Sequence, residues 1–223
     1  MDYISTFQRV EHKYLLSRQQ ADMFYQSIQS HVQKDRYPQY SLFNVYYDSC
    51  DYQMISKSIE SPKYKEKLRV RTYGENCPFL YVEMKKKYEG IVYKRRIERK
   101  IEDSSLLDYS QIGKELSYMF QHYDARPKVL IAYERNAFQA VDEADVRITF
   151  DTDIRYRLDH LELSDAYEDV HLLDKDSVLV EIKVMDRYPL WLIHALSALQ
   201  VQRTSFSKYG TIYINILKEK KYV

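Results

Sequence analysis

Glycine is scarce in this chain, with only 4 among 223 residues. Rossmann folds and P-loops need glycine where their backbone approaches phosphate, so the scarcity argues against both. The two cysteines, Cys50 and Cys77, show no motif spacing, which favours a reduced, cytoplasmic protein. Residues 1–14 lack the apolar stretch of a signal peptide.

Long apolar runs and a net charge are also lacking. No run approaches the ~20 residues that span a bilayer, so we expect no direct membrane insertion, and any membrane association would need a partner protein. The 34 basic and 33 acidic residues leave a net charge of +1. Nucleic-acid binders usually carry a basic excess, so we expect no nucleic-acid partner. Without repeats or linker-like stretches, the chain is predicted to form one domain over residues 1–223.

The chain is instead rich in strand-like segments. Strands are predicted at residues 7–16, 42–47, 65–73, 79–87, 91–101, 128–138, 146–156, 178–184 and 211–217, helices at 17–33, 52–59, 104–122 and 189–199, and a solvated tail at 218–221. Turn formers at 74–76 and 89–90 join three of the strands into an antiparallel meander. Many short strands separated by turn signals predict a barrel or a sandwich.

Charged side chains recur at every second position in these strands. The residues that share a face are Arg9, Glu11 and Lys13; Lys65, Lys67, Arg69 and Arg71; Glu83, Lys85 and Lys87; Lys94, Arg96 and Glu98; Tyr133 and Arg135; Arg147 and Asp151; and Glu181 and Lys183. For any single strand, a solvated face of an ordinary sandwich explains this pattern. In the alternative interpretation, the apolar faces pack outward against the helices and the charged faces line an interior.

Both charge signs occur together in three E-x-K segments, Glu11 to Lys13, Glu83 to Lys85 and Glu181 to Lys183. Lysine and arginine suit a polyanion, and interleaved carboxylates suit a divalent metal, because hard cations take oxygen ligands. Phosphate chains occur with such metals at phosphoryl-transfer sites. The pattern therefore indicates a site for a metal-bound phosphate chain.

Nine short motifs appear in a fixed order along the chain. They are Arg9-Val-Glu-His-Lys-Tyr14, Asn44-Val-Tyr-Tyr-Asp48, Lys67-Leu-Arg-Val-Arg71, Val82-Glu-Met-Lys85, Lys94-Arg-Arg96, Tyr133-Glu-Arg135, Val146-Arg-Ile148, Val180-Glu-Ile-Lys183 and Phe206-Ser-Lys-Tyr209. From about residue 7 to residue 210, the sequence resembles the VTC domain of polyphosphate polymerases, in the superfamily of triphosphate tunnel metalloenzymes with the CYTH-like fold.

This resemblance implies an α+β fold, with a closed antiparallel β-barrel of about eight strands forming a tunnel and helices packed outside. It implies transfer of the ATP γ-phosphate to a growing polyphosphate chain, with Mn²⁺ or Mg²⁺ as cofactor. The implied catalytic residues are Arg69, Arg71, Lys85, Arg135, Arg147 and Lys183, and the implied phosphate-binding residues are Lys13, Lys94, Tyr133, Ser207 and Lys208. Glu181 is the first metal ligand, and Glu11 and Glu83 are weaker candidates supported by the face they share.

Two other functions stay open at this point. With water as the acceptor, the same site is an inorganic or nucleoside triphosphatase, and without turnover it is a polyphosphate-binding module. Eukaryotic members of the family add membrane helices and a phosphate-sensing domain, so a membrane-protein partner is expected if the polymer crosses a membrane. The six histidines show no metal-ligand spacing, and residues 151–153 are interpreted as a turn or strand edge.

Overall fold

The computed structural model describes residues 10–61, 63–74, 76–89, 91–143, 145–185 and 187–217. Positions 7–9 of the first predicted strand, with Arg9, and the predicted tail at 218–221 lie outside these residues. The chain forms two compact units: unit 1 takes in the chain to Tyr40, Glu134–Asp153 and Leu173–Phe206, and unit 2 takes in Ser41–Tyr133, Ile154–Leu172 and the chain from Ser207. The single domain over 1–223 stays a prediction.

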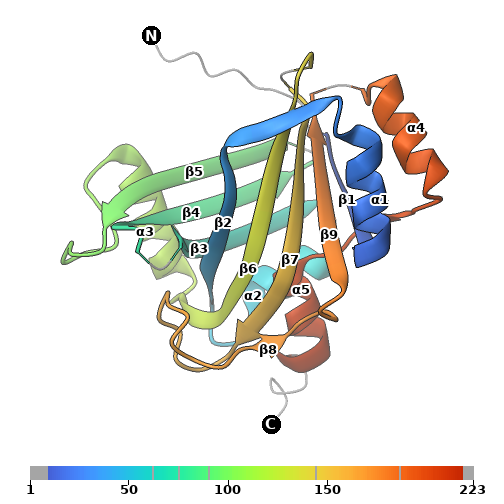
Figure 1. The fold of residues 1–223 in the computed structure, drawn as a ribbon. Coiled ribbons are helices and arrows are strands. Elements are labelled where there is room, and N and C mark those ends of the chain that lie inside the picture. Colours follow the sequence, from blue (N-terminus) through green and yellow to red (C-terminus); the bar gives the residue numbers. More distant parts are fainter. Residues whose placement is uncertain are drawn as a thin grey trace. The chain divides into compact units, whose positions relative to one another are not determined.

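The strands form a sheet that does not close into a barrel (Figure 1). They are β1 Val10–Ser17, β2 Val32–Asp48, β3 Tyr64–Tyr73, β4 Phe79–Tyr88, β5 Ile91–Lys100, β6 Arg126–Ala140, β7 Arg147–Arg157, β8 Val170–His171, β9 Ser177–Val184 and β10 Arg203–Thr204. Their hydrogen-bonded order is β10-β1-β9-β7-β6-β2-β3-β4-β5, with β8 beside β7. The predicted closed barrel is therefore wrong. Closure needs a ladder between the first and last strands, and β10 offers only two residues for one.

The helices are α1 Arg18–Ile28, α2 Gln53–Glu60, α3 Gln111–His122, α4 Leu190–Ala198 and α5 Lys208–Ile212, followed by the π-helical turn η1 Tyr213–Leu217. The strand predicted at 211–217 is therefore wrong. The Ser207 hydroxyl caps the start of α5 by accepting from the Gly210 N–H at 3.3 Å, and a capped start favours a helix. Among the described residues, no helix combines the length and apolarity that crossing a membrane requires.

In unit 1, the apolar faces of β1, β7 and β9 pack against α1 and α4, which lie side by side (Figure 1). Ile182 and Val184 of β9 are buried there with Phe24 of α1 and Leu192 of α4. Each such side chain contributes roughly 1.5–3 kcal/mol when it leaves water. The prediction that the apolar strand faces pack under helices is confirmed for this unit.

In unit 2, the apolar faces of β3 and β4 pack in the same way against α2 and α3. Leu68 and Val82 are buried together with Met54 of α2 and with Leu116 and Met119 of α3. Because successive strand residues point to opposite faces, this packing places Lys67, Arg69, Glu83 and Lys85 on the other side of the strands. The parity prediction for these strands is confirmed.

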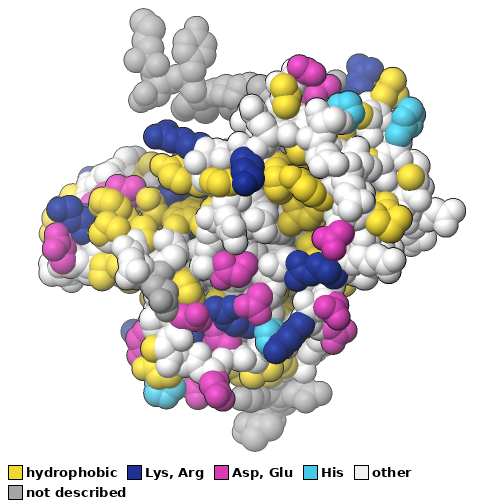
Figure 2. All heavy atoms as spheres, in the orientation of Figure 1, with side chains coloured by type: hydrophobic (Ala, Val, Ile, Leu, Met, Phe, Trp, Pro, Cys, Tyr) yellow, Lys and Arg dark blue, Asp and Glu magenta, His cyan; other side chains and the backbone are white. Residues whose placement is uncertain are grey.

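Arg157 holds the segment between β7 and β8 of unit 2 in place through several hydrogen bonds. Its guanidinium donates to the carbonyl oxygens of His160 (2.6 Å), Glu162 (2.6 Å) and Ser164 (2.8 Å) and to the Asp169 carboxylate (2.8 Å). On the face drawn in Figure 2, acidic and basic side chains intermingle over the end of β7 and β8. The side chains of Arg157 and Asp169 are both buried, and the Asp169 carboxylate also pairs with Arg155 at 3.2 Å.

We expect Arg157→Ala to lower the free energy of unfolding by about 2 kcal/mol, because it removes the donor of three carbonyl oxygens and leaves Arg155 as the remaining partner of Asp169. Arg157→Lys keeps the charge but lacks the planar fork that reaches several acceptors at once, so it should recover less than half of the loss. Urea denaturation measures both values. Full recovery by lysine would contradict the structural role assigned to the fork.

Candidate functional site

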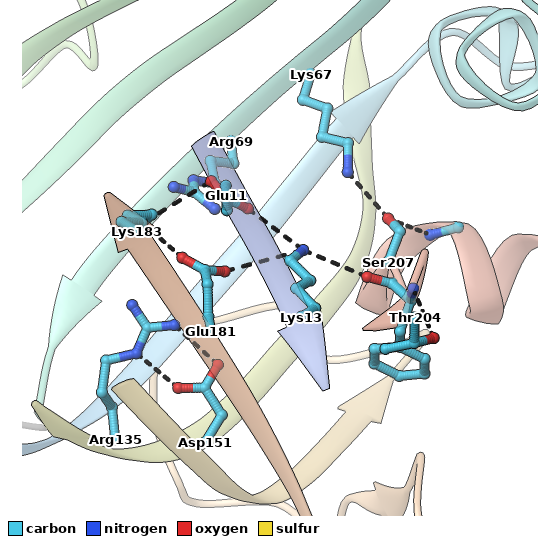
Figure 3. A network of polar contacts seen from close by, with 12 residues as sticks. Glu11, Lys13, Lys67, Arg69, Arg135, Asp151, Glu181, Lys183, Thr204 and Ser207 are labelled. Carbon is cyan, nitrogen blue, oxygen red and sulfur yellow. Dashed lines mark hydrogen bonds and ion pairs between the residues drawn. The ribbon is translucent and has the colours of Figure 1, made fainter. Parts of the chain in front are cut away.

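Four charged residues of unit 1 form a square across β1 and β9 (Figure 3). Glu11 lies opposite Lys183, and Lys13 lies opposite Glu181. Lys13 Nζ is 3.6 Å from Glu11 Oε1 and 3.9 Å from Glu181 Oε2, and Lys183 Nζ is 2.5 Å from Glu181 Oε1 and 4.0 Å from Glu11 Oε2. Each carboxylate therefore contacts both lysines, and the two signs alternate around the square.

Glu181 is the most buried member of this square, with 8% of its surface exposed. Burial alone would raise the pKa of its carboxyl, but the charges of Lys183, Lys13 and Arg135 hold that pKa well below its usual range. The group is thus ionised near neutral pH and offers the oxygen ligand that a hard cation takes.

The donor set around Glu181 fits a divalent cation shared with a substrate. The described part of the chain holds no group of three or more His, Cys, Asp or Glu placed to bind a metal. Mg²⁺ is usually bound through one or two carboxylates together with substrate phosphates and water. Glu181 and Glu11 supply two carboxylates. An ion held by them would keep its other coordination positions for substrate phosphates and water.

Arg135 and Arg147 extend the charged face of unit 1 onto β6 and β7. Arg135 forms two hydrogen bonds with the buried Asp151 carboxylate, at 2.6 and 2.8 Å, whereas Arg147 lies opposite Lys183 and pairs with Asp35 at 2.8 Å. The interpretation of Asp151 as a turn or edge residue is wrong, because it lies within β7 as the counter-ion of Arg135. Asp151 comes four residues after Arg147 and therefore lies on the same face of the strand. This spacing was the sequence signal for a place among the charged residues.

Three lysines of unit 2 lie in one row across β3, β4 and β5. Lys67 lies opposite Lys85, and Lys85 lies opposite Lys94. Like charges that face each other directly destabilise a sheet. Lys94 also reaches Glu83, at 3.3 Å, in the neighbouring row. A bound anion would reduce the repulsion along the row.

Glu83 is the counter-ion at the centre of this basic face. Its buried carboxylate lies 2.7 Å from Arg69, 3.3 Å from Lys94, and 3.8 Å from both Arg71 and Arg96. Burial would raise the pKa of Glu83, but the positive charges of Arg69, Arg71 and Lys94 lower it to about 2. The role of Glu83 as a metal ligand stays a prediction.

Neutral groups hold Arg71 in place. Its Nε donates to Asn44 Oδ1 at 2.9 Å, and its Nη1 donates to the Tyr73 hydroxyl at 3.4 Å. Asn44 is fully buried and donates in turn to the carbonyl oxygen of Ile131 at 3.1 Å. Asn44 belongs to one of the nine motifs, but nothing in the motif predicts that it supports Arg71.

The remaining predicted phosphate-binding residues gather at the start of α5 in unit 2. Lys67 Nζ donates to Ser207 Oγ at 3.0 Å (Figure 3), and Lys208 Nζ lies 4.1 Å from the ring centroid of Tyr133. Lys67 was absent from the predicted site residues, although it shares a strand face with Arg69 and Arg71. The structure adds it to the site.

The predicted residues thus fall into two groups. Unit 1 brings together Glu11, Lys13, Arg135, Arg147, Glu181 and Lys183, and unit 2 holds Arg69, Arg71, Glu83, Lys85, Lys94, Tyr133, Ser207 and Lys208. Glu181, Glu83 and Arg71 are only 8%, 2% and 7% exposed. The ordinary solvated face does not describe these three residues, whereas Lys85, Lys94 and Arg147 are exposed.

Comparison with known proteins gives the family. The profile of the VTC domain matches residues 8–215, which confirms the resemblance inferred from the nine motifs. A solved structure from Vibrio parahaemolyticus, provisionally named an adenylate cyclase, is 12% identical with a TM-score of 0.51, covers 93% of this chain and 98% of its own, and shares the fold. The PH1819 protein from Pyrococcus horikoshii is 16% identical with a TM-score of 0.47, covering 95% and 99%. No curated protein matches the sequence.

Proposed function

The chain belongs to the VTC domain family, within the triphosphate tunnel superfamily, and we propose that it is a metal-dependent polyphosphate polymerase. In this proposal it transfers the γ-phosphate of ATP to a growing polyphosphate chain. The observation that carries the proposal is the row of lysines 67, 85 and 94, which face one another directly across three strands. Such an arrangement suits a ligand with negative charges repeated along its length.

The side chains would act by positioning and by charge stabilisation, which supply most of the catalysis of phosphoryl transfer. Arg69 and Arg71 in unit 2, and Arg135 and Arg147 in unit 1, would hold non-bridging oxygens through their planar forks. The lysines at both groups would act as point charges. Glu181 and Glu11 would hold Mn²⁺ or Mg²⁺, which when bound supplies further neutralisation of phosphate charge.

The carboxylates of the site argue against one route to hydrolysis, in which a glutamate acts as general base for water. A general base works best with a pKa near the operating pH, but the pKa of Glu83 is about 2 and that of Glu181 is held well below its usual range. Both are therefore poor bases for activating water. The terminal phosphate of a polymer is already ionised and needs no such base.

A product analysis tests the proposal. The protein is incubated with ATP and Mn²⁺, and ADP, free phosphate and long-chain polyphosphate are measured together. We expect one phosphoryl group to be added to the polymer for each molecule of ADP that forms. ADP with free phosphate and no polymer would replace the proposal with a triphosphatase, and binding without turnover in any metal would replace it with a polyphosphate-binding module.

We further propose that the protein acts in the cytoplasm and that a membrane protein receives the polymer if it leaves that compartment. Cell fractionation with antibodies against the chain tests the location. Recovery of the protein only outside the cytoplasm would contradict this part of the proposal.

A further inference from the structure

Asp48, the last residue of β2, is a fully buried carboxylate in unit 2. It accepts hydrogen bonds from the backbone N–H groups of Ser49 (2.8 Å), Met54 (2.9 Å) and Ile55 (3.0 Å). Two of these donors belong to the first turn of α2, whose unpaired N–H groups attract a negative charge. Asp48 is thereby fixed in place from the β2 and α2 side.

Tyr209 of α5 uses this fixed carboxylate as its anchor. Its hydroxyl donates to Asp48 Oδ2 at 3.1 Å, and burial together with the negative charge of Asp48 raises the pKa of the hydroxyl. α5 has only five residues, which is too short for a helix to be stable by itself. A buried tertiary anchor at Tyr209 therefore fixes the position of the whole turn.

The position of Tyr209 sets the positions of Ser207 and Lys208, which directly precede it. Gly210 packs closely against Ser207, since a Cβ at Gly210 would lie 3.2 Å from the Ser207 side chain. The Ser207 hydroxyl contacts Lys67, and the Lys208 ammonium lies over the ring of Tyr133. Movement of the anchor would displace both predicted phosphate-binding groups.

Tyr46 of β2 connects the same anchor to Arg69. Its ring stacks on that of Tyr209, with 4.9 Å between centroids, and its hydroxyl accepts from Arg69 Nη1 at 3.2 Å. Burial alone would raise the pKa of Tyr46, but the charges of Arg69 and Lys67 lower it to about 7. Tyr46 therefore orients Arg69 through a hydroxyl oxygen, in addition to the contact of Arg69 with Glu83.

We propose that Asp48, Tyr209 and Tyr46 are positioning residues that hold Ser207, Lys208 and Arg69 ready for a phosphate chain. Groups fixed before binding lose less conformational freedom when the ligand arrives, so the gain appears as ligand affinity. This inference rests on the proposed function, because it assumes that these groups contact phosphate.

Isothermal calorimetry with inorganic tripolyphosphate, without turnover, tests the inference. We expect Tyr209→Phe to weaken binding by about tenfold, because it deletes the hydroxyl group that donates to the buried Asp48 carboxylate. Tyr156→Phe is the matched control, since Tyr156 is a buried tyrosine of β7 in the same unit and should leave the affinity within twofold. Thermal unfolding reports the stability of each variant.

A double-mutant cycle separates positioning from a general loss of stability. Because Tyr209 is proposed to act in part through Lys208, Tyr209→Phe should cost less than about fivefold in affinity when Lys208→Ala is already present, against about tenfold alone. An equal loss in both backgrounds, or unchanged binding by Tyr209→Phe alone, would overturn the inference and leave the proposed function standing. Failure of the unmodified protein to bind tripolyphosphate would overturn the proposed function and the inference with it.

Discussion

Glu181→Gln is expected to abolish turnover with ATP, with kcat falling by at least about 1000-fold, while the fold stays intact. A bound metal supplies several kcal/mol of charge stabilisation to the transition state, which corresponds to a rate factor of this size. Glutamine has nearly the same shape as glutamate but lacks the negative charge that Lys13 and Lys183 surround. The change therefore removes the charged metal ligand and little of the packing.

The measurement combines initial rates over a Mn²⁺ titration with tripolyphosphate binding in the absence of metal. Metal-free binding should be unchanged or tighter, because the variant removes a negative charge from the site. Glu115→Gln is the matched control, since Glu115 of α3 forms a partly exposed ion pair with Arg95 of β5, and such pairs contribute little. An unchanged rate in Glu181→Gln would remove Glu181 from the metal site.

The face on which each charged side chain lies was predictable because it depends only on the alternation of neighbouring residues in a strand. Val82 and Met84 are buried under helices, while Glu83 and Lys85 share the opposite face. The same local rule placed Glu181 and Lys183 together on β9. Only the relative positions of the strands remained to be supplied by the three-dimensional structure.

Barrel closure was not predictable in this way, because it depends on residues far apart in the sequence. Residues 211–217 are rich in β-branched and aromatic side chains, which favour a strand, yet the cap at Ser207 and the anchor at Tyr209 produce helical turns there. The anchor joins residues 161 positions apart. The sequence contains no local signal for that pairing, so the supporting residues of the site emerge only from the structure.

Glu83→Gln is expected to lower the free energy of unfolding by about 3 kcal/mol when no anion is bound, because it leaves Arg69 and its neighbouring cations without their buried counter-ion. The same change should tighten metal-free tripolyphosphate binding by about tenfold, or about 1.4 kcal/mol. In the variant, the oxygens of bound tripolyphosphate would neutralise the cations that Glu83 neutralises in the unmodified protein. Stability and affinity thus move in opposite directions.

Urea denaturation with and without tripolyphosphate, together with calorimetry, measures both effects. Glu98→Gln is the control, since Glu98 is an exposed carboxylate on β5 and should change neither value by more than about 0.5 kcal/mol. A ligand that binds only the folded state stabilises it by an amount that grows with the logarithm of its concentration divided by its Kd. Saturating tripolyphosphate should therefore restore most of the stability lost in Glu83→Gln. If the variant instead kept its stability and lost only metal-dependent activity, Glu83 would be a metal ligand rather than the counter-ion of the basic face.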